Sequence, residues 1–244
     1  MVELSTVLWK VREHVERDIA LPGLERETVM ATLVWLLERT LIRVGSHELA
    51  KENNSFGLTT LRRRHVSIDG STLRFEFRGK SGVAHVVAVT DRRIARIVQR
   101  CRELPGRELF QYVDARGRRQ IVYADDVNAY LRTITGRDVT AKDFRTWGGT
   151  MLAAVELRTM GAAASRREAD RNIIRAIDAV SERLGNTRTV CRKYYIHPAL
   201  LSAYIMGHTV PQPPAMSKKA KRSQPGAALR RDEVLVLQFL QEKV

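Results

Sequence analysis

Three short segments of alternating apolar and polar residues interrupt a chain whose periodicity elsewhere is helical. The segments and the turns between them are residues 60–68, Asp69-Gly70, residues 72–77, Gly79-Lys80-Ser81-Gly82 and residues 83–89. Asp-Gly between alternating segments is a strong hairpin signal. The sequence therefore predicts one small three-stranded antiparallel sheet at about residues 58–90, attached as an appendage to a helical core. Lys80 is expected at a hairpin tip, either merely solvated or reaching into a DNA groove.

Outside this sheet, apolar residues recur at the three- and four-residue spacing of helices. Helices are expected at residues 3–19, 25–42, 90–101, 123–134, 199–206 and 230–241. One further helix is expected to begin at Thr140, and another is expected to end at Leu184. Residues 103–120 contain Pro105, Gly106 and Gly117 and are expected to form a loop. The predicted fold class is therefore mainly α with one small antiparallel sheet (α+β).

The chain is strongly basic, because 42 lysines and arginines stand against 27 acidic residues and give 244 residues a net charge of +15. The apolar content is an ordinary 44%, so a folded core is expected. This charge favours a polyanionic partner, either nucleic acid or an anionic membrane. No apolar run approaches the roughly 20 residues that span a bilayer, and no secretory core begins the chain, so we expect a soluble, cytoplasmic protein.

Cysteine and histidine are too sparse for a recognisable metal site. Only Cys101 and Cys191 occur, which excludes a disulfide framework and a cysteine-rich zinc module. The six histidines are scattered, and none has metal-ligand spacing with another. We therefore expect neither a metal nor another cofactor.

The stretch from Leu184 to Pro198 holds the strongest candidate for chemistry. Gly185 stops the preceding helix, since glycine readily adopts the left-handed conformation, and it presents Asn186 at the helix end. Three cations and two adjacent tyrosines follow, namely Arg188, Arg192, Lys193, Tyr194 and Tyr195. Positive charge beside a phenol favours its ionised form, so Tyr195 is a candidate nucleophile. The alternative is an ordinary basic helix with a half-buried tyrosine.

Two further arginines are candidates for a functional site only when they are considered together with the other residues. Arg43 lies where a helix ends, and Arg145 lies in the first turn of another helix, where the helix dipole favours an anion. Each alone is compatible with a surface charge. The other candidates for contact with DNA phosphates are Arg62, Arg64, Arg74, Lys142, Arg188, Arg192 and Lys193.

Over roughly residues 25–200 the chain resembles the type IB DNA topoisomerases, and most closely their poxvirus-like bacterial branch. Five local motifs in family order carry the resemblance. They are Ile42-Arg43-Val44-Gly45, Gly57-Leu58-Thr59-Thr60-Leu61 with Arg64-His65-Val66 after it, Phe77-Arg78-Gly79-Lys80, Lys142-Asp143-Phe144-Arg145-Thr146-Trp147-Gly148 and Tyr195-Ile196-His197-Pro198. No single motif is specific, but their order and spacing make an accidental match a poor explanation.

The resemblance implies a fold and a mechanism. The fold would be the tyrosine recombinase and topoisomerase IB catalytic fold, and Tyr195 would form a 3′-phosphotyrosyl link to one DNA strand. Arg43, Arg145 and Asn186 would hold the phosphate oxygens, and Lys80 would protonate the leaving 5′ oxygen. Supercoils would relax without ATP or metal.

Two features depart from the family pattern. Asn186 stands where the poxvirus enzymes carry histidine, so it could donate a hydrogen bond without charge. Tyr194 competes with Tyr195, although the residues after Tyr195 match the family pattern better. The second departure is at the ends of the chain, because family members usually carry an amino-terminal domain that is not expected here. The chain is therefore expected to be a catalytic domain or a shortened form.

Two alternative functions stay open. Site-specific tyrosine recombinases share the fold, but they usually carry histidine where this chain has Lys142. A non-catalytic basic protein that binds DNA or a membrane surface is the second alternative. The predicted domains are a catalytic domain at residues 1–208 and a basic, proline-containing linker with a short helix at residues 209–244. We expect a monomer that binds double-stranded DNA, not a membrane, near the nucleoid.

Overall fold

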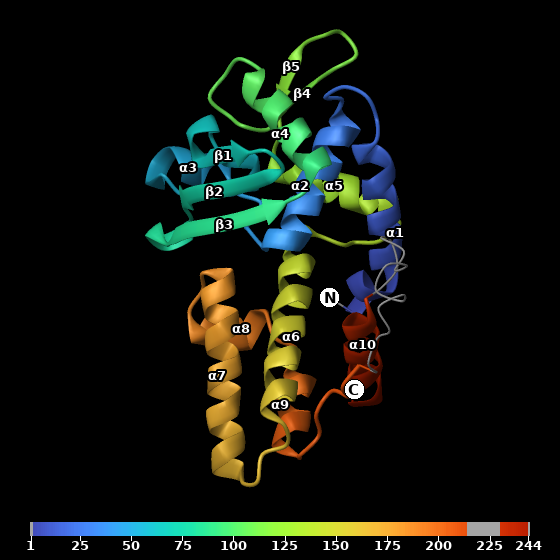
Figure 1. The fold of residues 1–244 in the computed structure, drawn as a ribbon, viewed down its shortest axis with the longest axis vertical. Coiled ribbons are helices and arrows are strands. Elements are labelled where there is room, and N and C mark those ends of the chain that lie inside the picture. The colour runs from blue at the N-terminus through green and yellow to red at the C-terminus, as the bar shows by residue number, and fades with distance from the viewer. Residues whose placement is uncertain (1, 214–229, 244) are drawn as a thin grey trace. The chain divides into compact units, whose positions relative to one another are not determined.

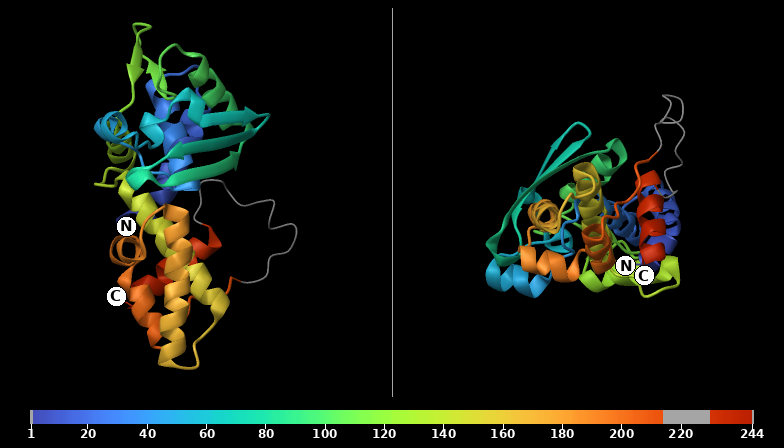
Figure 2. Two further views of the ribbon diagram at one scale, coloured as in Figure 1. Left: turned by 90° about the vertical axis from the view of Figure 1, so that its left-hand side faces the viewer. Right: turned by 90° about the horizontal axis from the view of Figure 1, so that it is seen from below.

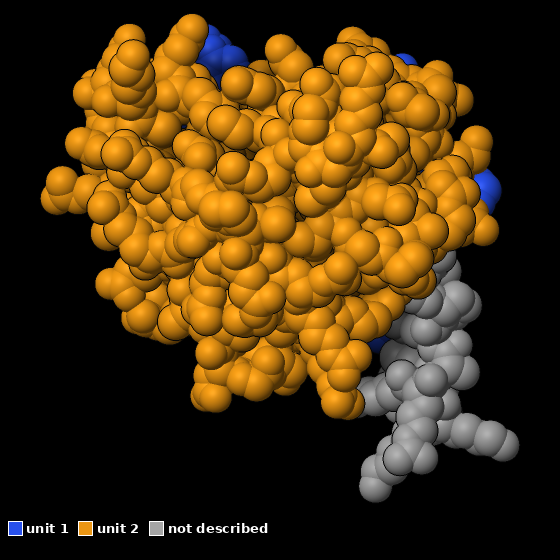
Figure 3. Space-filling model, turned by 90° about the horizontal axis from the view of Figure 1, so that it is seen from above, with its two compact units in different colours: residues 1–9, 143–244 blue, residues 10–142 orange. Residues whose placement is uncertain are grey.

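The computed structural model describes residues 2–213 and 230–243 and divides the chain into two compact units (Figures 1 and 3). We call residues 10–142 the sheet unit, and residues 1–9 with 143–244 the helical unit. Helix α1 (Val2–Ile19) contributes residues to both. Each unit is described by itself.

The sheet unit packs one face of an antiparallel sheet against helices. Its remaining elements are α2 (Arg26–Thr40), α3 (His47–Asn53), β1 (Val66–Asp69), β2 (Thr72–Arg78), β3 (Ala84–Thr90), α4 (Arg92–Glu103), β4 (Gln111–Val113), β5 (Arg119–Ile121) and α5 (Ala124–Thr135). The three longer strands lie in the order β1-β2-β3, with Phe75 opposite Val66 and Val87. Figure 1 labels these strands, and Figure 2 shows the same ribbon from two further sides. Leu73 and Phe75 are fully buried, and α2 and α4 contact the sheet. The expectation of an appendage is therefore wrong, since one sheet face belongs to the core.

The predicted first strand begins too early. Two short 3-10 turns stand there instead, Leu58–Thr60 and Arg63–His65, before β1 starts at Val66. Side chains satisfy the backbone locally, because the Gly57 N–H donates to Thr60 Oγ1 at 2.9 Å and the Arg62 N–H donates to His65 Nδ1 at 3.0 Å. Such bonds compete with a strand ladder.

Two other elements escaped prediction because they are short. Helix α3 has seven residues, and its N-cap Ser46 accepts a bond from the Leu49 N–H. The β4–β5 hairpin occupies the second half of the expected loop at 103–120 and ends one residue beyond it. Its turn is held by Asp114, which accepts from the Arg116 and Arg118 N–H groups, each at 2.9 Å. Three-residue strands are too short to show a period in sequence.

The helical unit contains α7 (Arg166–Leu184), α8 (Arg188–Tyr194), α9 (Pro198–Ile205), α10 (Arg231–Lys243) and all of α6 (Ala141–Met160) except its first two residues. Helix α7 buries Ile173, Ile177, Val180 and Leu184 at helical spacing. It is tied to α9 by Asn172 Nδ2, which donates to Tyr204 Oη at 2.8 Å. That hydroxyl donates in turn to the Gly161 carbonyl at 2.7 Å, so a buried polar chain fixes α7, α9 and the end of α6.

The predicted fold class is confirmed, since helices predominate in the part of the chain that the structure describes and the larger of its two sheets has three antiparallel strands. The predicted last helix is present as α10. Most of the predicted basic linker falls on residues 214–229, outside the described residues, and the boundary at residue 208 stays a prediction. Among the helices described, none combines the length and apolar character needed to cross a bilayer.

A buried histidine in the sheet unit predicts a pH-dependent stability. His65 is 8% exposed, and burial, followed by the charges of Arg64 and Arg62, lowers its pKa to about 4. Its Nδ1 must stay unprotonated to accept the Arg62 N–H. In the unfolded chain the ring takes up a proton near pH ~6.5. Between the folded pKa of about 4 and the unfolded pKa of ~6.5, the unfolded state binds more protons than the folded state. The free energy of unfolding therefore keeps its full value above the unfolded pKa and falls as the pH drops below it.

We expect this histidine to lower the free energy of unfolding by roughly 1 kcal/mol between about pH 7.5 and about pH 5, after allowance for solvent screening. His65→Asn keeps an acceptor for the Arg62 N–H but cannot titrate, so its unfolding free energy should fall less over that interval. Urea unfolding of both proteins at both pH values is the measurement. Equal losses in the two proteins would contradict the assignment.

Candidate active site

Tyr195 lies at the C-terminal end of α8 in the helical unit. The helix is capped by Thr187, whose hydroxyl accepts the Val190 N–H at 3.3 Å, and the Tyr195 N–H still donates to the Cys191 carbonyl at 2.9 Å. The Tyr195 backbone (φ −125°, ψ 0°) belongs to neither helix nor strand. Tyr195 is half-buried, whereas Tyr194 is 48% exposed with Lys193 Nζ 5.1 Å from its ring centroid.

Arg145 is buried beside this tyrosine. Its side chain is 4% exposed, its Cζ lies 5.2 Å from the centroid of the Tyr195 ring, and its Nη2 donates to the Leu184 carbonyl at 3.0 Å. That carbonyl belongs to the last residue of α7, where the negative end of the helix dipole favours a cation. The alternative of a surface arginine is therefore wrong, and Arg145 connects the end of α7 to Tyr195.

Asn186 follows the same helix end. Gly185 caps α7 in the left-handed conformation (φ 59°, ψ 49°), as the sequence predicts, and the Asn186 N–H donates to the Ser181 carbonyl at 3.2 Å. Asn186 is half-buried, and it lies two residues after the carbonyl that Arg145 binds. The helical unit thus gathers Arg145 with Tyr195 and holds Asn186 at the adjoining turn.

Arg43 lies in the sheet unit, just beyond α2, which ends with Leu41 in the left-handed conformation (φ 58°). The Arg43 carbonyl accepts the Leu58 N–H at 2.8 Å. A Cβ atom at Gly57 would lie only 2.5 Å from that carbonyl and 2.6 Å from Gly45 Cα. Only glycine allows this approach, so the backbone that carries Arg43 is fixed by a crossing of two chain segments.

Lys80 lies at the tip of the β2–β3 hairpin, as predicted, and is exposed. The Gly79 N–H donates to the Val83 carbonyl at 2.8 Å and closes the turn. A Cβ atom on Gly79 would lie 2.7 Å from the His85 ring, which stacks on Phe77 at 5.1 Å between centroids. The ammonium group is therefore carried on a short, closed tip.

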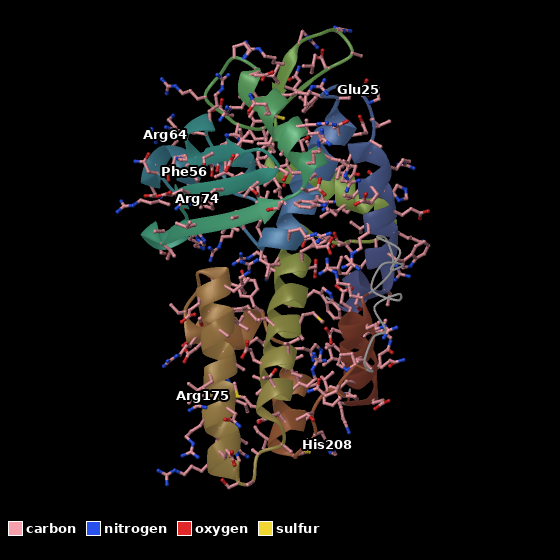
Figure 4. All side chains as sticks on the ribbon, in the orientation of Figure 1. Glu25, Phe56, Arg64, Arg74, Arg175 and His208 are labelled. Carbon is pink, nitrogen blue, oxygen red and sulfur yellow. The ribbon has the colours of Figure 1, made fainter. Side chains whose placement is uncertain are left out.

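The predicted DNA-binding cations differ in their surroundings. Arg64, Lys142, Arg192 and Lys193 are exposed, and Figure 4 labels Arg64 and Arg74 on the sheet unit. Arg74 and Arg188 are exposed too, but each is paired with a carboxylate, Arg74 with Glu76 at 2.5 Å and Arg188 with Asp178. Arg62 is half-buried, with its Cζ 5.0 Å from the Phe56 ring centroid. A phosphate would have to compete with the two ion pairs, and the DNA-binding roles stay predictions.

Sequence reasoning missed three residues of α6 that touch the tyrosine segment. They are Thr146, Gly149 and Thr150. The available signal was the pair Gly148-Gly149 inside a strongly helical stretch, because glycine within a helix costs about 1 kcal/mol relative to alanine and usually has a packing reason.

No group of three or more His, Cys, Asp or Glu residues that could hold a metal ion occurs within residues 2–213 and 230–243.

Comparison with known proteins gives concordant matches. A model of the family described as "Eukaryotic DNA topoisomerase I, catalytic core" matches residues 1–208. The chain is 27% identical over 205 residues to DNA topoisomerase 1B of Acanthamoeba polyphaga mimivirus, across 80% of this chain and 60% of that protein. It is 29% identical over 82 residues to DNA topoisomerase 1 of Mycosarcoma maydis, across 33% of this chain and 8% of that protein.

The chain therefore spans less than two thirds of the length of the curated relatives it matches. The family model, in contrast, covers most of the chain. Residues 1–208 include every residue that the sequence motifs assigned to catalysis. The chain thus belongs to the family of the eukaryotic DNA topoisomerase I catalytic core, which confirms the type IB relationship predicted from its motifs.

Proposed function

We propose that this chain cuts and rejoins one strand of double-stranded DNA through a covalent bond to Tyr195 and thereby relaxes supercoils. Family membership supports the reaction. The observation that carries the choice of site is the buried Arg145 guanidinium, which lies over the Tyr195 ring while bound to the end of α7. A guanidinium held beside the nucleophile would stabilise the charge that develops on a phosphate when Tyr195 attacks it.

In the proposed cleavage step, Tyr195 Oη attacks a DNA phosphorus atom and its proton passes to water. The bond from phosphorus to the 5′ oxygen breaks, and the Lys80 ammonium gives that oxygen a proton. The products are a 3′-phosphotyrosine and a free 5′-hydroxyl, and religation reverses both steps. Since one phosphodiester replaces another, the number of high-energy bonds does not change and ATP is not required. The cationic side chains supply the charge that a metal would otherwise supply.

We assign Arg43, Arg145 and Asn186 to the non-bridging phosphate oxygens. A guanidinium can bind two such oxygens at once, whereas the Asn186 amide donates a hydrogen bond without charge. Arg43 and Lys80 belong to the sheet unit, and Arg145, Asn186 and Tyr195 belong to the helical unit. The net charge of +15 supports DNA as the partner.

The recombinase alternative is disfavoured by the family match and by Lys142, and the match likewise disfavours a non-catalytic protein. We also propose that the protein acts as a monomer near the nucleoid in the cytoplasm. Its basic charge and its motifs support this placement and the bacterial branch. The named relatives come from a virus and a fungus.

Relaxation of plasmid DNA tests the proposal. The chain should relax positively and negatively supercoiled plasmid in the presence of a chelator and without ATP, and detergent should trap protein on the 3′ end of the nick. Relaxation that requires ATP or a divalent cation, or protein trapped on the 5′ end, would contradict the proposed reaction.

The neighbouring tyrosines give a matched pair of variants for the nucleophile. Tyr195→Phe should abolish covalent capture of DNA, because it removes the attacking oxygen, and it should leave noncovalent binding nearly intact. Tyr194→Phe removes a hydroxyl from the more exposed neighbour and should keep activity. Gel analysis of trapped complexes and a binding titration measure both properties. Activity lost in Tyr194→Phe but kept in Tyr195→Phe would reverse the assignment.

The general-acid role of Lys80 predicts a dependence on the leaving group. Lys80→Ala should slow single-turnover cleavage by about 10²-fold or more, which is the usual range for loss of a general acid. A substrate with sulfur at the 5′ bridging position releases a thiolate, which needs no proton. Cleavage of this substrate by Lys80→Ala should therefore recover most of the lost rate. Lys51→Ala, an exposed lysine on α3, is the control and should behave as wild type. Equal defects of Lys80→Ala on both substrates would indicate that Lys80 only positions DNA.

The role proposed for Asn186 predicts that a different hydrogen-bond donor is tolerated at this position. Asn186→Ala removes the amide and should lower the single-turnover cleavage rate by about 10-fold, comparable to loss of one transition-state hydrogen bond. Asn186→His restores a donor and should stay active. An alanine variant with the wild-type rate would remove Asn186 from the site.

A further inference from the structure

One face of α6 contacts the tyrosine segment at three points. The Thr146 hydroxyl donates to the Tyr194 carbonyl at 3.3 Å, and the Thr150 hydroxyl accepts the His197 N–H at 3.0 Å. Between them, the backbone of Gly149 approaches the Tyr195 carbonyl so closely that a Cβ atom there would lie 2.5 Å from its oxygen. Positions 149 and 150 lie three and four residues after position 146, so both are neighbours of Thr146 on the helix surface.

Gly149 is the central contact. It lies inside a 20-residue helix, where glycine is about 1 kcal/mol less favourable than alanine. Its Cβ position would also lie 3.3 Å from Val180 Cγ1 and 3.4 Å from Leu184 Cδ1 of α7. The missing side chain therefore lets α6 press against both α7 and the backbone of Tyr195. A methyl group would have to displace the main-chain oxygen, which cannot rotate away as a side chain can.

The contacts act on the backbone around Tyr195, not on its ring. Because Tyr195 has neither helical nor extended torsion angles, its own secondary structure leaves its carbonyl side unsupported. The α6 contacts hold the main chain at three points, namely the Tyr194 carbonyl, the Tyr195 carbonyl and the His197 N–H. Arg145 lies on the same helix, one residue before Thr146. One rigid element thus carries both the cation assigned to the phosphate and the contacts that hold the nucleophile.

We propose that Thr146, Gly149 and Thr150 form a backbone clamp that positions Tyr195 for attack on the phosphorus atom. This inference rests on the proposed function, since it takes Tyr195 as the nucleophile. In this proposal the clamp residues are positioning residues that act through the backbone of the tyrosine segment. Their effect is orientational, because a misplaced nucleophile loses rate even when its chemistry is unchanged. The same restraint acts in religation, where the phosphotyrosine must stay in line with the incoming 5′-hydroxyl.

Single-turnover cleavage at saturating DNA separates positioning from folding. The amplitude reports the fraction of active protein, and the rate constant reports the orientation of Tyr195. Thr150→Val is nearly isosteric but removes the acceptor for the His197 N–H, and Gly149→Ala adds the obstructing methyl group. Each variant should lower the cleavage and religation rate constants by about 10-fold or more while DNA affinity and amplitude stay near wild type.

Conservative and matched variants complete the test. Thr150→Ser keeps the hydroxyl and should restore the rate. Thr159→Val removes a hydroxyl from the same helix that bonds only within it, to the Val155 carbonyl at 2.8 Å, and should leave the rate unchanged. If Gly149→Ala fails to fold, Thr150→Val and Thr150→Ser still decide the question.

The outcomes separate this proposal from the proposed function. Cleavage by Tyr195→Phe would overturn the assignment of the nucleophile itself. An inactive Tyr195→Phe together with wild-type rate constants for both Thr150→Val and Gly149→Ala would overturn the clamp alone. A reduced amplitude with an unchanged rate constant would assign the α6 residues to folding and would also overturn the clamp.

Discussion

The contact on which the candidate site depends is the one between Arg145 and the carbonyl that ends α7. Arg145 is only 4% exposed, so the loss of water around its charge must be offset by other partners. The Leu184 carbonyl at 3.0 Å and the face of the Tyr195 ring are two such partners. Because the helix end is fixed by Gly185, the position of the cation follows from where α7 stops. A shift of that helix end would move the cation and the following turn together.

Glycine permits the close backbone contacts that hold both halves of the proposed site. In the sheet unit, Gly57 lies against the Arg43 carbonyl, and in the helical unit Gly149 lies against the Tyr195 carbonyl. In each place an added Cβ atom would lie 2.5 Å from a main-chain oxygen, closer than Cβ atoms are found in proteins. Backbone restraints of this kind orient a functional residue without contacting its side chain, which remains available for substrate.

Local patterns predicted those elements whose stabilising contacts are local. The Asp69-Gly70 turn and the Gly79–Gly82 tip predicted the three-stranded sheet, and Gly185 predicted the end of α7. Prediction failed where hydrogen bonds to side chains replaced the backbone hydrogen bonds between strands. Residues 58–60 and 63–65 form 3-10 turns because Thr60 and His65 accept hydrogen bonds from nearby N–H groups, a competition that alternation of apolar residues does not reveal.

The sequence by itself determined the helical fold class, the family and the order of the motifs that carry Arg43, Lys80, Arg145, Asn186 and Tyr195. Those features follow from periodicity, turn residues and local motifs, which are properties of neighbouring residues. Only the tertiary structure decided that Arg145 is buried over Tyr195 and that α6 holds the tyrosine segment through Gly149. Arg145 lies 39 residues from its carbonyl partner, so its surroundings depend on how α6, α7 and α8 pack together. No local pattern in the chain specifies that packing.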